Sequence, residues 1–223
     1  MRILLASQAP FEAADGGWRL VDLARGLSSA GHEVQCVVVD REFRGGDAVP
    51  IRRVVCRSGD ATADLPFDVP GFGPPRPGGQ TFADLTDRQL ADYRDVLRMA
   101  LDFEIAAFDP HVVHAHHIWI LGHLALEAGA PYVLSTSGTE LPIYRIDTRF
   151  RRYAEEAAEN AGRILATSDA VRQDVLATFG DLDGRVVAMP PELASGSPSQ
   201  AAAWLGPIYR DVLADRFGRD LES

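Results

Sequence analysis

The sequence predicts an α/β fold, a doubly wound parallel sheet of the Rossmann-like kind. Short apolar runs with strand character alternate with amphipathic helical stretches of roughly ten residues through most of the chain. The 223 residues are enough for one such domain with a buried core, but too few for two domains that share a cleft. The composition, 46% hydrophobic and 24% charged, is that of a folded globular protein.

The N-terminal part of the chain predicts a βαβ unit. A strand over 2–6 is followed by a helix over 18–30 and by a second strand over 34–39. Hydrophobic residues recur at helical spacing to give the helix one apolar face, and Gly31 ends it as a C-terminal cap. The residues of this face are Leu20, Leu23, Ala24 and Leu27.

A third strand over 51–56 leads into a long segment, 57–80, that is rich in proline and glycine. Long irregular segments in compact domains are either binding loops or disordered, and the sequence leaves both interpretations open. An amphipathic helix follows and ends at Asp109-Pro110, because proline disfavours helical backbone in the residue before it. Its apolar face consists of Leu90, Tyr93, Leu97, Leu101 and Ile105.

The alternation of strands and helices continues along the rest of the chain. Strands are expected at 112–113, 132–135, 164–166 and 186–187, and helices at 121–127, 151–160 and 170–178. We expect a domain over 1–190, a hinge and linker over 191–203, and a final amphipathic helix over 204–217 that packs back on the domain. Ligands of such a sheet lie at the carboxyl ends of its strands.

Charge and cysteine content narrow the class of protein. The formal net charge of −10 argues against nucleic acid or an anionic membrane as a partner, because either needs a basic surface. The 22 basic residues are all arginine. Cys36 and Cys56 lie in apolar runs and predict neither a disulfide nor a zinc site. No run is long enough to cross a membrane, so we expect a cytoplasmic protein.

Three features could carry chemistry. Gly16 and Gly17 stand before the first predicted helix, where backbone N–H groups can contact a phosphate, although a glycine pair is also common in plain turns. His114, His116 and His117 end a predicted strand, where they could act in catalysis, bind a metal or serve as buried structural residues.

The third feature is the polar turn Ser137-Gly138-Thr139-Glu140, which follows the next predicted strand. Its carboxylate could accept hydrogen bonds from substrate hydroxyls, and an ordinary helix-capping turn has a similar composition. A cluster of arginines follows, interspersed with acidic residues, and is interpreted as a solvated helix face. These arginines are Arg145, Arg149, Arg151 and Arg152.

The order of several motifs resembles glycosyltransferase family 4. They are Met1-Arg2-Ile3-Leu4-Leu5, the Gly16-Gly17 helix start, Gly31-His32-Glu33-Val34, the segment from Asp109 to His116, Gly138-Thr139-Glu140-Leu141, and Ala166-Thr167-Ser168-Asp169-Ala170-Val171 with Phe179-Gly180. The similarity covers about residues 1 to 190.

The resemblance implies a GT-B fold and a retaining transfer of sugar from a nucleotide-sugar donor, with no cofactor and no essential metal. It implies that this N-terminal domain holds a small-molecule or glycan acceptor at Ser137, Gly138, Thr139 and Glu140. It places Gly16 and Gly17 near the donor phosphates and a histidine, His116 or His117, near the transferred sugar.

Two departures from the family pattern bear on activity. Ser137 stands where the family usually has a histidine, and serine cannot replace imidazole as an acid–base group. After Pro190, where the family continues into a donor-binding domain, this sequence has only the linker and one helix. The hypothesis is an acceptor-side domain that lacks its donor domain and transfers sugar weakly or not at all. The alternatives are an accessory subunit that pairs with a separate donor-domain chain and, last, a metal-dependent hydrolase using His114 and His116.

Overall fold

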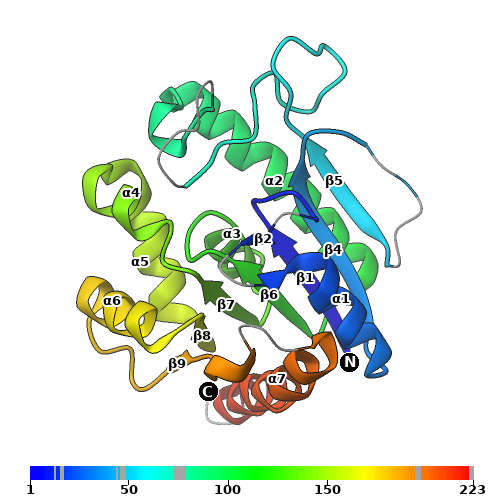
Figure 1. Cartoon of the computed structure of the whole chain (residues 1–223), viewed down its shortest axis with the longest axis vertical. Helices are drawn as coiled ribbons and strands as arrows, with labels where there is room; N and C mark the ends of the chain where they lie inside the picture. Colours follow the sequence, from blue (N-terminus) through cyan, green and yellow to red (C-terminus); the bar gives the residue numbers. More distant parts are fainter. Residues whose placement is uncertain are drawn as a thin grey trace.

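The computed structural model describes residues 1–12, 14–15, 18–43, 45, 49–72, 79–193 and 197–220. Within these ranges seven parallel strands form one sheet in the order β5-β4-β1-β6-β7-β8-β9 (Figure 1). The strands are Arg2–Ser7 (β1), Glu33–Asp40 (β4), Ile51–Val55 (β5), Val112–His116 (β6), Tyr132–Thr136 (β7), Arg163–Ala166 (β8) and Val186–Ala188 (β9). The predicted doubly wound parallel sheet is confirmed.

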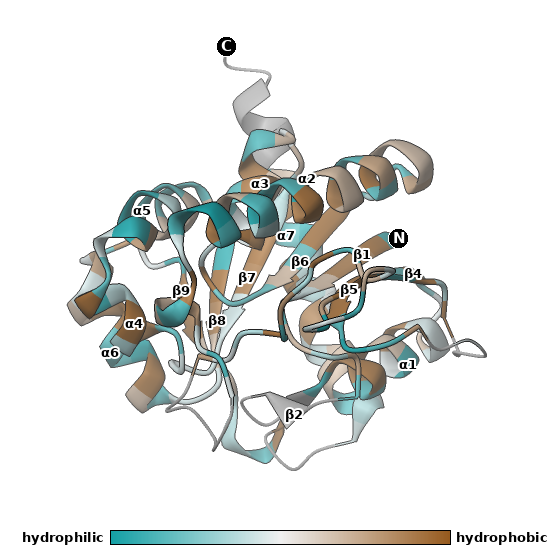
Figure 2. Ribbon diagram, turned by 90° about the horizontal axis from the view of Figure 1, so that it is seen from above, coloured by the Kyte–Doolittle hydropathy of each residue, from teal (hydrophilic) through white to brown (hydrophobic). Residues whose placement is uncertain are grey.

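Helices cover both faces of the sheet, and the hydrophobic strands lie between the two helical layers (Figure 2). One face is covered by α1 (Leu20–Ser29) and α7 (Pro198–Asp220), which pack on each other. The helices of the other face are α2 (Asp87–Phe108), α3 (Leu121–Glu127), α4 (Leu141–Ile146), α5 (Arg151–Asn160) and α6 (Asp169–Phe179).

The alternation of side chains along each strand divides the core into two clusters. In β1, Leu4 and Ala6 belong to the α2 side, whereas Ile3 and Leu5 belong to the α1 and α7 side. This follows from the two-residue period of a strand, and it explains why these central strands are apolar on both faces. Both cysteines, Cys36 and Cys56, are buried.

Several predicted boundaries are confirmed to the residue, and others are corrected. Helices α3 and α5 span the expected residues, and α2 ends at Phe108 before the left-handed Asp109. Helix α1 begins at Leu20 rather than at residue 18, because Trp18–Arg19 (β3) pairs with Ala14–Asp15 (β2) as a short antiparallel ribbon. Helix α4 was not predicted, since six residues are too few to show a period.

The last helix also begins earlier than predicted, at Pro198 instead of residue 204. The expected linker 191–203 therefore contains the short 3-10 helix Pro191–Leu193 (η3) and the first turn of α7. Residues 194–196 lie outside the described ranges. No helix among the described residues is long and apolar enough to cross a membrane.

Candidate functional site

The strand order creates a switch point between β1 and β6. The connection after β1 runs through α1 on one face, and the connection after β6 runs through α3 on the other. A crevice opens outside the carboxyl ends of two strands whose connections part in this way, and it is the usual ligand site of open α/β sheets. Gln8, which directly follows β1, links the segments after β1 and β6. Its Nε2 donates a hydrogen bond to the carbonyl of Trp119 at 2.9 Å.

The segment that follows β6 is fully buried and has unusual backbone. His117 and Ile120 have positive φ angles, 73° and 58°, although neither is glycine. Positive φ is costly for bulky and β-branched residues, and such strain is found preferentially at functional sites. This left-handed backbone at His117 comes directly after the last residue of β6.

His114 has a structural role. Its Nδ1 lies 2.7 Å from the hydroxyl of Tyr209 on α7, and its ring stacks on His116 with centroids 5.0 Å apart. Complete burial, and secondarily the nearby His116, keep the pKa of His114 well below its usual value, so the ring is neutral. Among the described residues no three metal-ligating side chains come together, and the hydrolase interpretation has no support from this geometry.

The polar turn after β7 lies beside the β6 loop, as the parallel sheet requires. The N–H of Gly138, where φ is +81°, donates to Oγ1 of Thr136 at 2.9 Å, and Ser137 and Thr139 join their hydroxyls at 3.0 Å. Thr139 is exposed, whereas Glu140 is 1% exposed.

Glu140 connects the two loops. Its Oε1 accepts a long hydrogen bond, 3.3 Å, from the backbone N–H of Ile118, and its Oε2 has no partner among the described residues. A buried carboxylate with one weak donor is destabilising, so this position is poised to accept further hydrogen bonds.

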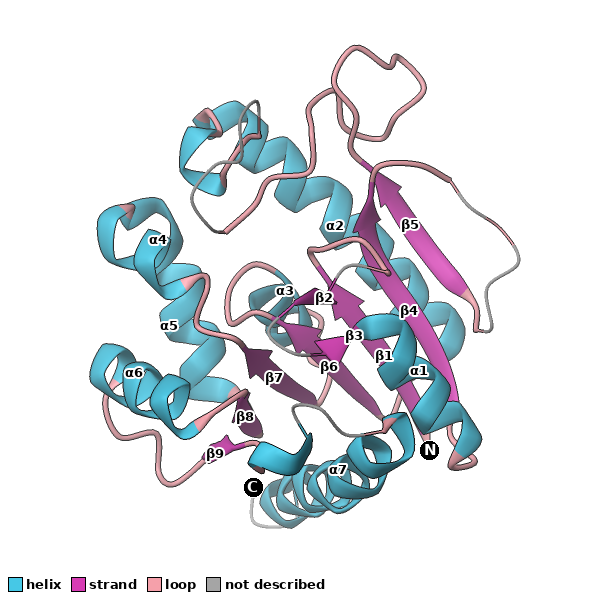
Figure 3. Ribbon diagram, in the orientation of Figure 1, coloured by secondary structure: helices cyan, strands magenta, loops and turns pink. Residues whose placement is uncertain are grey.

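A small pocket, partly open to solvent, lies at the carboxyl ends of β6, β7, β8 and β9. Its lining combines histidines and hydroxyl side chains with apolar side chains, among them Met189 and Trp204. The lining residues are His116, His117, Ser135, Thr136, Ser137, Leu165, Ala166, Thr167, Met189 and Trp204. The structure thus brings together the two predicted histidines and Ser137. Figure 3 shows the strands of the sheet as arrows, whose heads mark the carboxyl ends of the strands.

An aromatic cluster backs the β6 loop. Phe72 stacks on His117 with ring centroids 4.0 Å apart, and it also contacts Phe82 at 4.7 Å. Trp119 packs against Phe82 and, at 3.8 Å, against Phe150. We call Phe72, Phe82, Trp119 and Phe150 the aromatic wall.

The structure also places the remaining predicted residues and shows residues at the site that the sequence did not indicate. Gly16 and Gly17 lie outside the described residues, and α1 starts three positions after Gly17. Sequence reasoning missed Gln8, Trp204 and the aromatic wall, because single residues in separate loops show no period. It interpreted Arg149 as part of a solvated helix face, which is wrong: this residue lies before α5 and is enclosed by hydrogen bonds.

The parallel seven-stranded sheet, with its site at the strand ends beside the switch point, defines a Rossmann-like domain of the GT-B type. Residues 16–192 match the family model of the glycosyl transferase 4-like domain. This chain belongs to that family, as its motifs indicated. No curated protein sequence matches the chain.

Solved structures agree with the fold. Sucrose-phosphate synthase from Thermosynechococcus elongatus is 15% identical with a TM-score of 0.56, over 85% of this chain and 47% of that one. A second structure of that enzyme is 15% identical with a TM-score of 0.59, over 95% of this chain and 99% of that one. UDP-GlcNAc 2-epimerase from Neisseria meningitidis, bound to UDP-GlcNAc, gives 9% and 0.52 over 86% and 47%. The chain therefore spans about half the length of the first and third.

Proposed function

We propose that this chain is the acceptor-side half of a retaining glycosyltransferase that uses a nucleotide-sugar donor. The observation that carries the proposal is the pocket at the strand ends, which combines His116, the Ser137 turn and the indole of Trp204 in a member of the glycosyl transferase 4-like family. Hydroxyl and imidazole groups hydrogen-bond to sugar hydroxyls, and an aromatic ring packs against the apolar face of a sugar.

Each site residue then has a distinct role. His116 hydrogen-bonds to the transferred sugar from the pocket wall, and His117 and the Ser137–Thr139 hydroxyls contact the acceptor. Glu140 supplies the buried carboxylate that orients an acceptor hydroxyl through Oε2. Gly16 and Gly17 contact the donor phosphates through backbone N–H groups, in keeping with their position ahead of α1.

Catalysis by this site requires a second wall. Transfer depends on holding donor and acceptor together in one geometry, and the single sheet described here supplies one side of the cleft. This chain covers 47% of the first sucrose-phosphate synthase structure that it resembles. We therefore propose that the isolated chain transfers sugar weakly or not at all, and that a donor-binding domain or a partner chain completes it.

Titration calorimetry with a panel of nucleotide sugars and free nucleotides, alongside a sugar-transfer assay, tests this function. We expect the chain alone to bind the donor weakly and to show no turnover. The Glu140→Gln and His116→Ala variants should bind the donor no more tightly than the wild type. Turnover should appear with a donor domain, and Glu140→Gln should then lower it about 10- to 100-fold, the value of a hydrogen bond to a charged group. His32→Ala, far from the pocket, is the control. Tight donor binding with turnover by the chain alone would refute the half-site proposal.

A further inference from the structure

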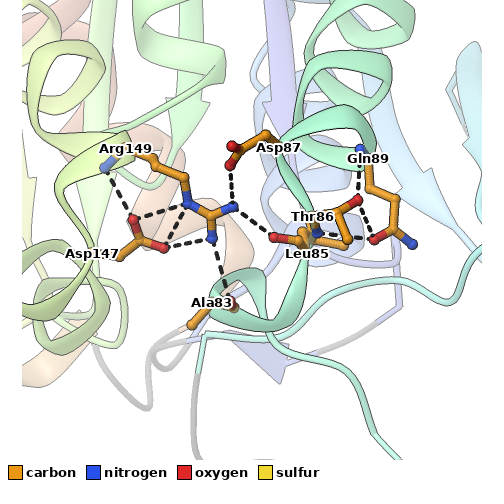
Figure 4. Close-up of polar contacts among 7 residues, drawn as sticks. All are labelled: Ala83, Leu85, Thr86, Asp87, Gln89, Asp147 and Arg149. Atoms are coloured by element: carbon orange, nitrogen blue, oxygen red, sulfur yellow. Dashed lines mark hydrogen bonds and ion pairs between the residues drawn. The ribbon is translucent and has the colours of Figure 1, made fainter.

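One arginine outside the pocket holds two distant connections of the fold together at the sheet edge that carries the site. Arg149 lies in the 3-10 turn Thr148–Phe150 (η2), which precedes α5, and its side chain is 28% exposed. It reaches the segment that precedes α2, which includes the 3-10 turn Phe82–Asp84 (η1) (Figure 4). The two segments are more than 60 residues apart in the sequence.

The guanidinium group is fully used. Nε donates to the Asp147 carboxylate at 3.0 Å, and Nη2 donates to the same carboxylate at 2.7 Å. The remaining donors reach across to the other segment: Nη1 to the Leu85 carbonyl at 2.6 Å and to Asp87 at 3.0 Å, and Nη2 to the Ala83 carbonyl at 3.3 Å. One donor on Nε and two on each Nη give five, the full complement of an arginine.

This geometry needs an arginine and its acidic partner. The planar guanidinium presents its donors in a fixed fork, whereas a lysine ammonium cannot meet a carboxylate and two carbonyls on separate segments at once. Asp147 orients the fork from within the same turn, and the hydrogen bonds from Arg149 hold the pKa of its carboxyl below its usual value. Both groups of the pair are therefore charged at neutral pH.

The hydrogen bonds from Arg149, which we call the Arg149 clamp, hold residues that belong to the aromatic wall or adjoin it. Phe82 is the first residue of η1, whose carbonyls at Ala83 and just beyond at Leu85 accept from Arg149. Phe150, the neighbour of Arg149, packs on Trp119, and the guanidinium lies 5.5 Å from the centre of the Phe150 ring.

The segment that precedes α2 also holds Phe72 in place beside His117. The N–H of Gly71 donates to the Gln80 carbonyl at 2.9 Å, and the N–H of Phe82 donates to the Gly71 carbonyl at 3.2 Å. These two bonds tie the strand-like stretch at Gly71 to η1, so the position of η1 fixes Phe72. Phe72 in turn lies against the ring of His117.

We propose that Arg149 is a positioning residue for the acceptor side of the site: by fixing η1 to the α4–α5 connection it sets Phe72 and Phe82, and through them the ring of His117. The assignment of this side of the site to the acceptor rests on the proposed function, whereas the positioning role of Arg149 does not. Arg149 touches no pocket residue directly, so its effect is transmitted through the aromatic wall.

Hydrogen exchange and ring-proton chemical shifts, measured by NMR on the whole chain, test this role without any sugar. In Arg149→Met we expect the amides of Gly71 and Phe82 to exchange about tenfold faster, the effect of losing a charge-assisted hydrogen bond, and the His117 ring protons to shift as Phe72 moves. The amide of Leu5, in the central strand β1, should be unchanged. Arg149→Lys should restore part of the protection, because one or two of the bonds remain possible.

The matched control is Arg145→Met, which removes a nearby arginine in the last turn of α4 whose side chain contacts Asp174 and Thr178. It should change none of these signals. Unchanged exchange at Gly71 and Phe82 would overturn the proposal, and so would an equal acceleration at Leu5, which indicates a loss of overall stability. If Arg149→Met does not fold, the comparison of Arg149→Lys with the wild type decides in the same way. Failure of sugar binding in the wild type would refute the proposed function and leave these readouts intact.

Discussion

Glu140 and His117 illustrate how single residues at the strand ends depart from what stability alone would favour. Glu140 is among the most buried carboxylates described, yet the one hydrogen bond that its side chain makes to the described residues spans 3.3 Å. His117 holds a left-handed backbone that a glycine would adopt without strain. Both departures lie at the switch point, and each costs stability. Their concentration at one edge of the sheet is what marks the site in physical terms.

The candidate site residues could be proposed from the sequence because they stand at the ends of predicted strands. Chain position after a strand places a side chain at the carboxyl edge, and this holds for His116, His117 and the Ser137 turn. The sequence could not separate His116 from His117, because their directions depend on the backbone angle at His117. It also could not assign His114, because its partner Tyr209 lies 95 residues away.

The buried, neutral His114 predicts a specific dependence of stability on pH. Its folded-state pKa is depressed below the unfolded value of about 6.5, so the unfolded state binds more protons and acid favours unfolding. The stabilisation from a neutral His114 is complete above pH 6.5 and is lost as the pH falls below it. We expect His114→Leu to flatten the curve of unfolding free energy from pH 6.5 to 5 by up to about 1.4 kcal/mol per pH unit.

Denaturant unfolding of the wild type and the variant at several pH values measures this difference. The comparison cancels the titration of all other groups, including Glu104, whose pKa is raised by burial and which contributes with the opposite sign. Parallel curves for the two proteins would show that the pKa of His114 is the same in the folded and unfolded states, which would contradict the prediction. His111→Leu, an exposed histidine near the N-terminal end of β6, serves as the control.

At the scale of elements, the close contact of α1 with α7 shows why a glycine is needed inside a helix. A Cβ at Gly26 would lie 2.2 Å from the Pro198 carbonyl oxygen, so only glycine allows the start of α7 to approach α1 this closely. Glycine within a helix is ordinarily unfavourable by roughly 1 kcal/mol. The sequence predicted both helices from their periodicity, but a packing distance between them has no sequence signal.

Gly26→Ala should therefore destabilise the protein by about 1–3 kcal/mol, the usual cost of overpacking, despite the higher helix propensity of alanine. Gly206→Ala, on α7 itself, is the matched control. Its Cβ would meet only the Arg210 side chain at an ordinary 3.7 Å, so we expect it to stabilise by about 0.5–1 kcal/mol. Thermal unfolding of both variants measures the effects. A stabilised Gly26→Ala variant would mean that α7 shifts freely on α1.

At the scale of the whole molecule, α7 is part of the domain's own core and not an appendage. Five of its residues, Ala201, Ala202, Leu205, Tyr209 and Val212, are buried in the same cluster as Ile3, Leu5 and other strand residues. Trp204 from this helix also lines the pocket. Helix α7 therefore covers part of one face of the sheet and contributes to the pocket at the same time.

Removal of residues 198–223 should abolish the cooperative folding of the chain. Loss of α7 uncovers apolar strand residues on the α1 face and removes the partner of His114, and a single fully buried leucine or tyrosine contributes several kcal/mol. We expect strong binding of a hydrophobic dye and a broad thermal transition, measured by fluorescence and circular dichroism. A sharp transition at an unchanged temperature would show that the sheet is stable without this helix. Arg210→Ala, on the exposed side of α7, should behave as the wild type.

The sequence by itself determined the alternation of strands and helices, the family, and the strand ends on which the site lies. These follow from local periodicity and from motifs that are contiguous in the chain. Tertiary structure alone decided the strand order that puts Gln8 beside Trp119, the direction of His117, the aromatic wall, and the clamp by which Arg149 joins two remote connections. The physical reason is that these features depend on contacts between residues far apart in the chain, and a local pattern carries no information about such distances.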